Sequence, residues 1–143
     1  MKNNRSYCPL VNILDILGDK WSLIIVRDIF HGKKSYGEFL ASPENISTSV
    51  LASRPQLLER TGLIKHRPFN DKKVKYYYLT DRGIDLYPIL YEMFYWSKRN
   101  LDKVFYPIAE QWFKRYKSIS SREAINDNQK KYKKVRAELL VFK

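Results

Sequence analysis

The sequence predicts a mainly α-helical fold with one small β-hairpin, and three observations lead to this prediction. Apolar residues recur at helical spacing through most of the first 58 residues. Two short strand candidates, 63–67 and 74–79, then flank a polar turn that contains Asn70, Asp71, Lys72 and Lys73. After the second strand candidate, helical spacing resumes and continues toward the end of the chain.

Two helices are expected before residue 32. Pro9 suits the first position of a helix, with Cys8 as its cap, and Gly18 ends that helix. Asp19 can cap a second helix that begins near Trp21 and stops before residue 32. Both segments repeat their apolar residues at helical spacing.

The next two helical segments have the arrangement of a helix-turn-helix. A short helix is expected over 35–40, and a longer one follows the turn at 42–45, capped by Ser47 and ended by Gly62. One side of the longer helix is apolar, with Val50, Leu51, Leu57 and Leu58. The opposite side carries Ser49, Ala52, Ser53 and Gln56, and such small or hydrogen-bonding side chains favour close approach to base edges.

The hairpin after this pair predicts a winged helix-turn-helix, and further helices follow it. Thr80 caps the next helix, which Pro88 is expected to kink or break early. Another helix begins near Pro107, and Ser120 with Glu123 matches a capping box for the last one. The last helix carries an apolar stripe that is expected either to pack on the body or to form a dimer contact, and its members are Ile125, Tyr132, Val135, Leu139 and Phe142.

The charge of the chain favours a polyanionic partner. The formal net charge is +12 and the isoelectric point is near 9.8. Residues 98–143 carry 13 basic and 5 acidic side chains, whereas residues 1–97 carry 14 and 10. We therefore expect a DNA-binding domain over 1–100 and a basic helical extension over 101–143, which is a rival contact for nucleic acid.

The residue types argue against several other classes of protein. The single cysteine allows no intrachain disulfide and favours a reducing cytosol, and the longest apolar run, 23–26, is too short to cross a bilayer. His31 and His66 have no local partner set for metal binding or nucleophilic catalysis, and five scattered glycines form no phosphate loop. We expect a cytoplasmic protein that is not an enzyme and that needs no cofactor or metal.

The order of these motifs resembles the HxlR-type winged-helix transcriptional regulators over about residues 7–98. The matching motifs are Cys8-Pro9, Gly18-Asp19-Lys20-Trp21, Tyr36-Gly37-Glu38-Phe39, Ile46-Ser47, Leu51, Leu57-Leu58-Glu59, Gly62-Leu63-Ile64, Tyr76 to Gly83, and Trp96. The resemblance implies a homodimer on an inverted-repeat operator, with repression or activation of a nearby gene. It also implies dimer contacts from the N-terminal helix and from the helix after the wing.

The chain departs from the family pattern at Pro55 and in its length. The family has an apolar residue, usually Leu, at this buried position of the recognition helix. Proline there removes the hydrogen bond to the carbonyl of Leu51 and clashes with it, which costs ~3 kcal/mol in a regular helix interior. We therefore expect the helix to kink or restart at Pro55. The tail beyond Asn100 exceeds the family core, and no function is transferred to it.

The expected DNA contacts fall into two groups. Phosphates would be contacted by Lys34, Ser35, Tyr36, Arg67, Lys72, Lys73 and Lys75. Bases in the major groove would be read by Ser47, Thr48, Ser49 and Ser53, together with Arg54 and Gln56. The alternative for each residue is a solvated polar side chain without a partner.

Cys8 is a candidate redox or electrophile sensor, because some relatives sense through a cysteine at this position. A helix N-terminus favours a thiolate, and Lys2 and Arg5 add positive charge nearby. Oxidation would then give a disulfide between subunits or a mixed disulfide with a small thiol. The alternative is an inert cysteine that only packs.

A different class of function is a small-molecule-binding module with only incidental affinity for nucleic acid. Its pocket would be lined by Tyr91, Phe94, Tyr95, Trp96 and Trp112. Such aromatic sets more often form a core or a dimer interface.

Overall fold

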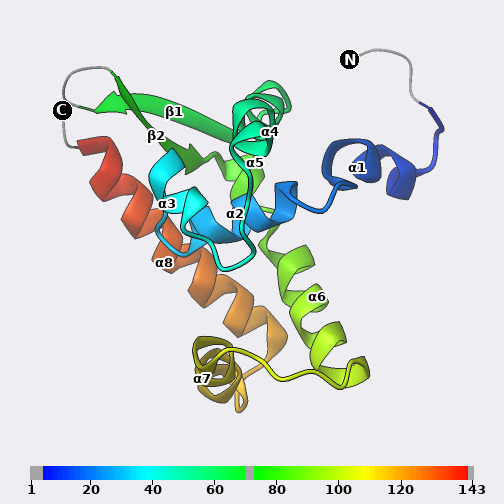
Figure 1. The fold of residues 1–143 in the computed structure, drawn as a ribbon. Coiled ribbons are helices and arrows are strands. Elements are labelled where there is room, and N and C mark those ends of the chain that lie inside the picture. Colours follow the sequence, from blue (N-terminus) through cyan, green and yellow to red (C-terminus); the bar gives the residue numbers. More distant parts are fainter. Residues whose placement is uncertain (1–4, 70–72, 142–143) are drawn as a thin grey trace.

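The computed structural model describes residues 5–69 and 73–141, and it has the expected mainly helical fold with one hairpin (Figure 1). Its elements are α1 (Pro9–Leu17), α2 (Ser22–Phe30), α3 (Tyr36–Leu40), α4 (Thr48–Arg60), β1 (Ile64–Phe69), β2 (Val74–Leu79), α5 (Asp81–Ile84), α6 (Tyr87–Asn100), α7 (Pro107–Tyr116) and α8 (Ser121–Val141). The helix-turn-helix is α3 and α4, and the wing is β1 and β2. None of the helices described is long and apolar enough to span a membrane.

The first two helices begin next to the capping residues expected from the sequence, and the start of one of them is shifted by one residue. Cys8 stands at the N-cap of α1 and Pro9 in its first turn, as expected, and the Cys8 side chain makes no capping hydrogen bond. The Asp19 carboxylate accepts the N–H groups of Trp21 and Ser22, each at 2.9 Å. Because both N–H groups are bound in this way, α2 begins at Ser22, and the expected placement of Trp21 inside the helix is wrong by one residue.

The expected restart of α4 at Pro55 is wrong, because the helix continues from Thr48 to Arg60. Pro55 is almost fully buried and lies on the same side as the buried residues Leu51 and Leu58. Burial of the ring in the core offsets part of the cost of the lost hydrogen bond. By contrast, the expected early break at Pro88 is confirmed, since α5 ends at Ile84 and Pro88 stands in the first turn of α6.

The two strands of the wing pair antiparallel, with Ile64 opposite Leu79 and Phe69 opposite Val74. The second strand lies where it was expected, whereas the first is shifted to Ile64–Phe69. This shift follows from the register, because β1 extends as far as its partner strand does. The predicted turn residues at 70–72 lie outside the described residues.

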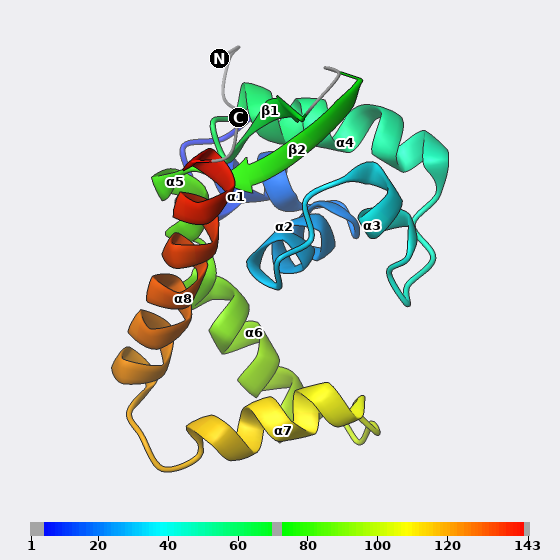
Figure 2. The same cartoon turned by 90° about the vertical axis from the view of Figure 1, so that its left-hand side faces the viewer.

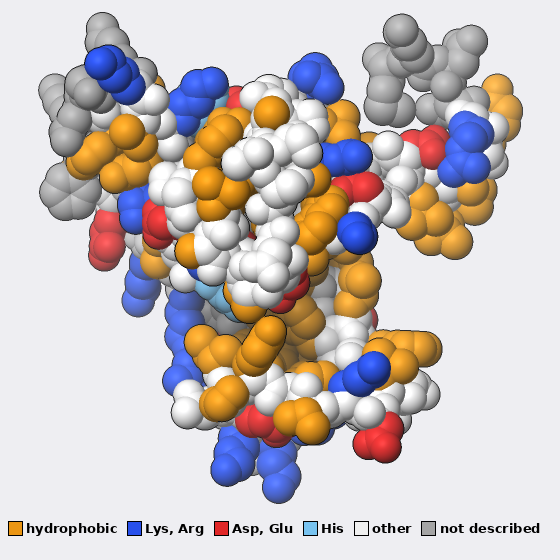
Figure 3. Space-filling model, in the orientation of Figure 1, with side chains coloured by type: hydrophobic (Ala, Val, Ile, Leu, Met, Phe, Trp, Pro, Cys, Tyr) orange, Lys and Arg blue, Asp and Glu red, His pale blue; other side chains and the backbone are white. Residues whose placement is uncertain are grey.

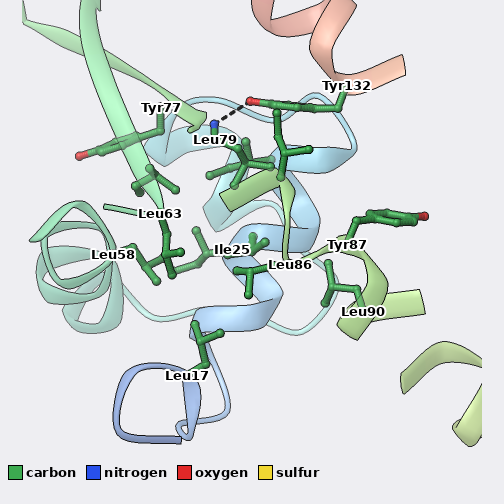
Figure 4. Packing of buried hydrophobic residues seen from close by; sticks show 14 of the residues in the cluster. Leu17, Ile25, Leu58, Leu63, Tyr77, Leu79, Leu86, Tyr87, Leu90 and Tyr132 are labelled. Atoms are coloured by element: carbon green, nitrogen blue, oxygen red, sulfur yellow. Dashed lines mark hydrogen bonds between the residues drawn. The ribbon is translucent and has the colours of Figure 1, made fainter. Parts of the chain in front are cut away.

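The core forms around α2, and Figure 4 shows part of it. Ile25 of α2 is fully buried, and it lies in one cluster with Leu58 from α4 and with Tyr77 and Leu79 from β2. The buried stripe of α4 therefore fixes how this helix is rotated about its axis. Its opposite face is left on the outside of the molecule.

The last helix packs on the body rather than standing free. Its Tyr132 hydroxyl accepts the N–H of Leu79 at 2.8 Å, where β2 ends (Figure 4). Arg136 donates to the carbonyl of Leu79 at 3.0 Å, and from the wing Arg67 donates to the carbonyl of Leu139 at 2.7 Å. Of the two roles expected for α8, packing on the body is confirmed, and a role in a dimer stays a prediction. Figure 2 shows α6 and α7 below α2, and α8 running from the end of α7 up to the wing.

Candidate nucleic-acid interface

The outward face of α4 consists of small polar side chains. Ser47 caps the helix, with its hydroxyl accepting the N–H of Val50 at 3.2 Å and lying 3.0 Å from the hydroxyl of Ser49. Ser49, Ala52 and Ser53 are exposed, as are Ser47 and Thr48. Over its first two turns this face carries no long charged side chain, and the exposed Arg60 follows on the same face at the end of the helix. Four of the predicted base-reading residues, Ser47, Thr48, Ser49 and Ser53, therefore lie together on open surface.

The other two predicted base-reading residues are engaged within the protein. The Arg54 guanidinium lies 3.5 Å from the carboxylate of Asp19 and so links α4 to the start of α2. Burial opposes the charge of Asp19, but hydrogen bonds from Ser22 and Trp21 and the nearby Arg54 hold its pKa below the ordinary value. Gln56 donates at 3.5 Å to the hydroxyl of Tyr36, and its own carbonyl oxygen is buried without a partner among the described residues.

The predicted phosphate contacts on α3 are gathered around its first turn. The Ser35 hydroxyl accepts the N–H of Glu38 at 3.3 Å and thereby caps the helix. Lys34 lies 3.7 Å from the Glu38 carboxylate, and its ammonium stands 5.2 Å from the centre of the Tyr76 ring. Tyr36 is partly exposed and stacks on Tyr77 of the wing. The start of α3 and the wing are thus joined through aromatic and cationic contacts.

The wing presents basic side chains of two kinds. Lys73 and Lys75 are exposed, whereas Arg67 is half-buried and bonded to the end of α8. Lys72 lies outside the described residues. Lys65 was not among the predicted contacts, and it is exposed on β1 two positions before Arg67. The two-residue period of a strand was the signal that places Lys65 and Arg67 on one face of the hairpin.

A buried ionic cluster was also missed, and it holds the turn between α3 and α4. Asp28 is only 2% exposed; it accepts the hydroxyl of Ser42 and pairs with Arg27 at 2.8 Å. Arg27 in turn donates two hydrogen bonds to the carboxylate of Glu44, at 2.6 and 3.0 Å. Lys33 completes the cluster at 3.8 Å from Asp28. We call these five residues the turn clamp. Its sequence signal was an aspartate between apolar residues of a helix.

The charges of the turn clamp support one another. Burial alone would lower the pKa of Arg27, but its bonds to Glu44 and Asp28 raise that pKa above the ordinary value. The Glu44 carboxyl has a lowered pKa, mainly because it accepts hydrogen bonds from Arg27. Both groups are charged at neutral pH, so the clamp is complete there. Since Ser42 and Glu44 lie between α3 and α4, the clamp fixes the angle at which the second helix leaves the first.

Cys8 is an exposed free thiol at the start of α1. Its backbone N–H donates to the hydroxyl of Ser6 at 3.1 Å. Arg5, one of the two cations expected to activate the thiol, pairs with Asp15 at 2.9 Å. The other, Lys2, lies outside the described residues.

Four of the five aromatic residues of the alternative pocket meet in space. The Trp112 ring from α7 lies within 5.6–5.8 Å, centre to centre, of Tyr91, Phe94 and Tyr95 on α6. Trp96 is 54% exposed and makes no ring contact with the residues described. In the described ranges, 5–69 and 73–141, no group of three or more His, Cys, Asp or Glu residues is arranged to hold a metal ion.

Comparison with known protein sequences finds a matching family model and similar regulators. A family model for HxlR-like helix-turn-helix proteins matches residues 16–105. YvaP of Bacillus subtilis, named an HTH-type transcriptional regulator, is 33% identical over 105 residues, which span 72% of this chain and 97% of YvaP. The regulator sll1512 of Synechocystis is 32% identical over 87 residues, which span 60% of this chain and 64% of sll1512.

Solved structures show the same fold. The redox regulator HypR in its oxidised form superposes with a TM-score of 0.60 at 31% identity, over 67% of this chain and all of HypR. The reduced form of the transcriptional regulator YodB from B. subtilis superposes with a TM-score of 0.56 at 26% identity, over 68% of this chain and 97% of YodB.

Proposed function

Because the chain belongs to the HxlR-like helix-turn-helix family of transcriptional regulators, we propose that it binds a specific duplex DNA site as a homodimer and regulates a nearby gene. The single observation that carries this proposal is the outward face of α4. It is small, polar and exposed, and the turn clamp and the buried stripe hold it in one orientation. A helix held in this way can enter a major groove.

In this proposal α4 reads bases and the surrounding basic residues bind phosphates. The hydroxyls of Ser47, Thr48, Ser49 and Ser53 can each donate and accept, so they can bond to base edges. Arg54 and Gln56 stay candidates that must first exchange their contacts with Asp19 and Tyr36. The phosphate group of contacts consists of Lys34, Ser35, Tyr36, Arg67, Lys72, Lys73 and Lys75.

The homodimer is proposed from two exposed apolar stripes. On α1, Leu10 and Leu14 are exposed one turn apart. On α6, Ile89, Met93 and Trp96 are exposed at helical spacing. Figure 1 shows α1 projecting from the body of the molecule. Apolar stripes of this kind are unfavourable in water and mark a surface for association. Two copies related by a twofold axis would bind an inverted repeat.

Cys8 is proposed as the redox-sensitive group of this dimer. It is exposed next to the apolar stripe of α1, and two structural neighbours are a redox regulator and a regulator solved in its reduced form. Two Cys8 thiols, one from each subunit, would give two electrons and two protons to hydrogen peroxide. The products are one disulfide and two water molecules.

The test of the redox proposal compares the oxidised protein with a Cys8→Ser variant. Peroxide treatment should give a dimer on a non-reducing gel and change the DNA affinity of the wild type, while Cys8→Ser changes in neither respect. Mass spectrometry shows whether Cys8 has reacted. An unchanged affinity with fully oxidised Cys8 would remove the sensor and leave the DNA-binding proposal intact.

The test of the DNA-binding proposal begins with selection of binding sites from random duplex DNA. The selected site should be an inverted repeat bound by two chains, with affinity that falls steeply as salt rises. Ser49→Asp with Ser53→Asp should abolish specific binding, because two carboxylates would face the groove. Ser118→Asp with Asn126→Asp adds the same charge near the start of α8 and should leave binding nearly unchanged. Equal losses in both double variants, or selection without any preferred sequence, would reject the proposal.

A further inference from the structure

A large hollow lies between the helix-turn-helix and the C-terminal helices. Its volume is about 970 Å³, and its walls come from α2, α6, α7 and α8, from the loop before α7 and from the turn between α3 and α4. Figure 3 shows apolar side chains around a depression between the upper and lower parts of the molecule. This volume lies at the upper end of the range for small-molecule sites, about 300–1,000 Å³.

The walls are mainly apolar and partly aromatic. Leu23 and Ile24 of α2 form one side, Phe94 of α6 another, and Trp112 of α7 a third. The indole N–H of Trp112 already donates to Asn128 at 3.4 Å, so its ring is fixed and its polar atom is not turned into the hollow for a ligand. Such walls favour the apolar body of an organic molecule. They offer few hydrogen-bond partners to polar groups on that part of the ligand.

The charged groups at the rim are unbalanced. Four basic side chains and two carboxylates line the hollow. The two carboxylates, Asp28 and Glu44, are bonded to Arg27 and Lys33 in the turn clamp. Lys131 is bonded to Asp127, outside the hollow, at 3.1 Å. Arg115 is exposed and makes no hydrogen bond or ion pair with any residue in the described part of the chain, although its charge helps to lower the pKa of Asp127, so its N–H groups are left for an anion.

We propose that this hollow binds a small organic acid, with its apolar body between Leu23, Phe94 and Trp112 and its anionic group at Arg115. The anion would meet the exposed guanidinium, which can form two parallel hydrogen bonds to a carboxylate or sulfonate. The apolar body would fill space that is otherwise unfavourably exposed to water. The site uses α7 and α8, both of which lie beyond the part of the chain matched by the family model.

Occupancy of this site would also change the DNA affinity, and this part rests on the proposed function. Arg27 and Glu44 line the hollow and belong to the turn clamp that orients α4. A ligand in contact with them would favour one arrangement of the clamp over another. By linkage, DNA and ligand would then change each other's affinity by the same factor.

The first experiment measures ligand binding without DNA. The probes are 8-anilinonaphthalene-1-sulfonate and N-phenyl-1-naphthylamine, which share an apolar body and differ by the sulfonate. Each should bind the wild type at one site per chain, the sulfonate more tightly. Arg115→Gln should weaken the sulfonate about threefold to tenfold and leave the neutral probe unchanged. The matched control Lys114→Gln, on α7 but outside the hollow, should alter neither.

A second pair of variants tests the location. Ala109→Trp places a large ring into the hollow from α7, and Ser97→Trp does so from α6 if the first variant does not fold. Either should abolish binding of both probes while circular dichroism stays unchanged. Probe binding that survives a folded filled variant, or equal effects of Arg115→Gln and Lys114→Gln, would overturn the site. Loss of the dimer in the filled variant would assign the hollow to a second copy of the chain instead.

The regulatory part is tested on the selected DNA site. Saturating sulfonate probe should shift the DNA affinity of the wild type and not that of Ala109→Trp. If the probe binds the hollow and the DNA affinity does not move, coupling is overturned while the ligand site stands. If the protein did not bind the DNA site at all, this would already be seen without the probe. Failure of the proposed DNA binding is thereby distinguished from failure of the coupling.

Discussion

At the scale of single residues, the structure depends most on Asp28. Its carboxylate is buried, and it is tolerated there because Arg27, Lys33 and Ser42 all contact it. Replacement by an uncharged side chain leaves Arg27 bonded to Glu44 and Lys33 bonded to Ser42, without the buried carboxylate that joins the two cations. The position of α4 therefore depends on one side chain of α2.

Asp28→Ala should destabilise the protein by about 1–3 kcal/mol, because it removes the buried acceptor of the hydrogen bonds from Ser42 and Arg27. Urea unfolding followed by circular dichroism measures this change. Asp85→Ala removes an exposed carboxylate after α5 and should change stability by less than about 0.5 kcal/mol. Similar values for the two variants would show that the turn clamp contributes nothing to stability.

The lowered pKa of Glu44 predicts how the stability contributed by the turn clamp changes in acid. Its pKa is lower in the folded protein than the ordinary value of 4.5, mainly because of the hydrogen bonds from Arg27. The unfolded chain therefore binds the proton first as the pH falls. The stabilisation is complete above pH 4.5 and is lost as the pH passes down through the folded pKa.

The difference in unfolding free energy between wild type and Glu44→Gln should thus be constant near neutral pH and shrink in acid. Urea titrations at several pH values give this difference directly. Glu123→Gln, at an exposed carboxyl at the start of α8, serves as control. A difference that grows below pH 4.5 would contradict the direction of the pKa shift.

Residue-scale prediction from sequence succeeded where the rules are local. The capping roles of Ser47, Thr80 and Ser120 were predicted, and each hydroxyl accepts the expected N–H group. The turn clamp was missed because Arg27 and Glu44 are 17 positions apart. No local pattern indicates that two such residues will meet.

At the scale of elements, α4 shows tertiary packing overriding local preference. Pro55 was expected to kink or restart the helix, and the helix instead continues through it without a restart, with the ring buried. Propensity scales describe a helix alone, whereas this one is held along one side by the core. The predicted restart was therefore wrong for a physical reason, and a kink at Pro55 stays a prediction.

Pro55→Ala should stabilise the protein by about 1–2 kcal/mol. The substitution restores a hydrogen bond to Leu51 and removes a clash, which together cost ~3 kcal/mol. It also removes two buried carbon atoms, each worth about 0.8 kcal/mol. Urea unfolding provides the measurement. A loss of stability would mean that packing of the proline ring outweighs the backbone cost.

The contact between α8 and the wing could not be predicted from the sequence. Tyr132 and Leu79, which form its central hydrogen bond, are 53 positions apart. The periodic stripe of α8 indicated an apolar face but not its partner. The helix start at Ser121 was predicted because the Ser120 and Glu123 capping pair lies next to it.

At the scale of the whole molecule, the central question is assembly. Leu14→Glu should convert the proposed dimer to a monomer, because it places a charge in the apolar stripe of α1. Analytical ultracentrifugation measures the mass, and affinity for the selected inverted repeat should fall with it. Val104→Glu, at a fully exposed position before α7, is the matched control and should leave the dimer intact. A dimer that survives Leu14→Glu would place the interface elsewhere.

The most direct measurement is photo-crosslinking from α4 to the selected DNA. A benzoylphenylalanine at position 52, in the centre of the outward face, should crosslink to bases in the major groove of each half-site. The same group at position 104 should give no crosslink, since that position lies before α7. Crosslinks from position 52 in both half-sites would establish α4 as the reading helix of a dimer. Specific binding without any crosslink from position 52 would contradict this assignment and direct attention to the basic extension.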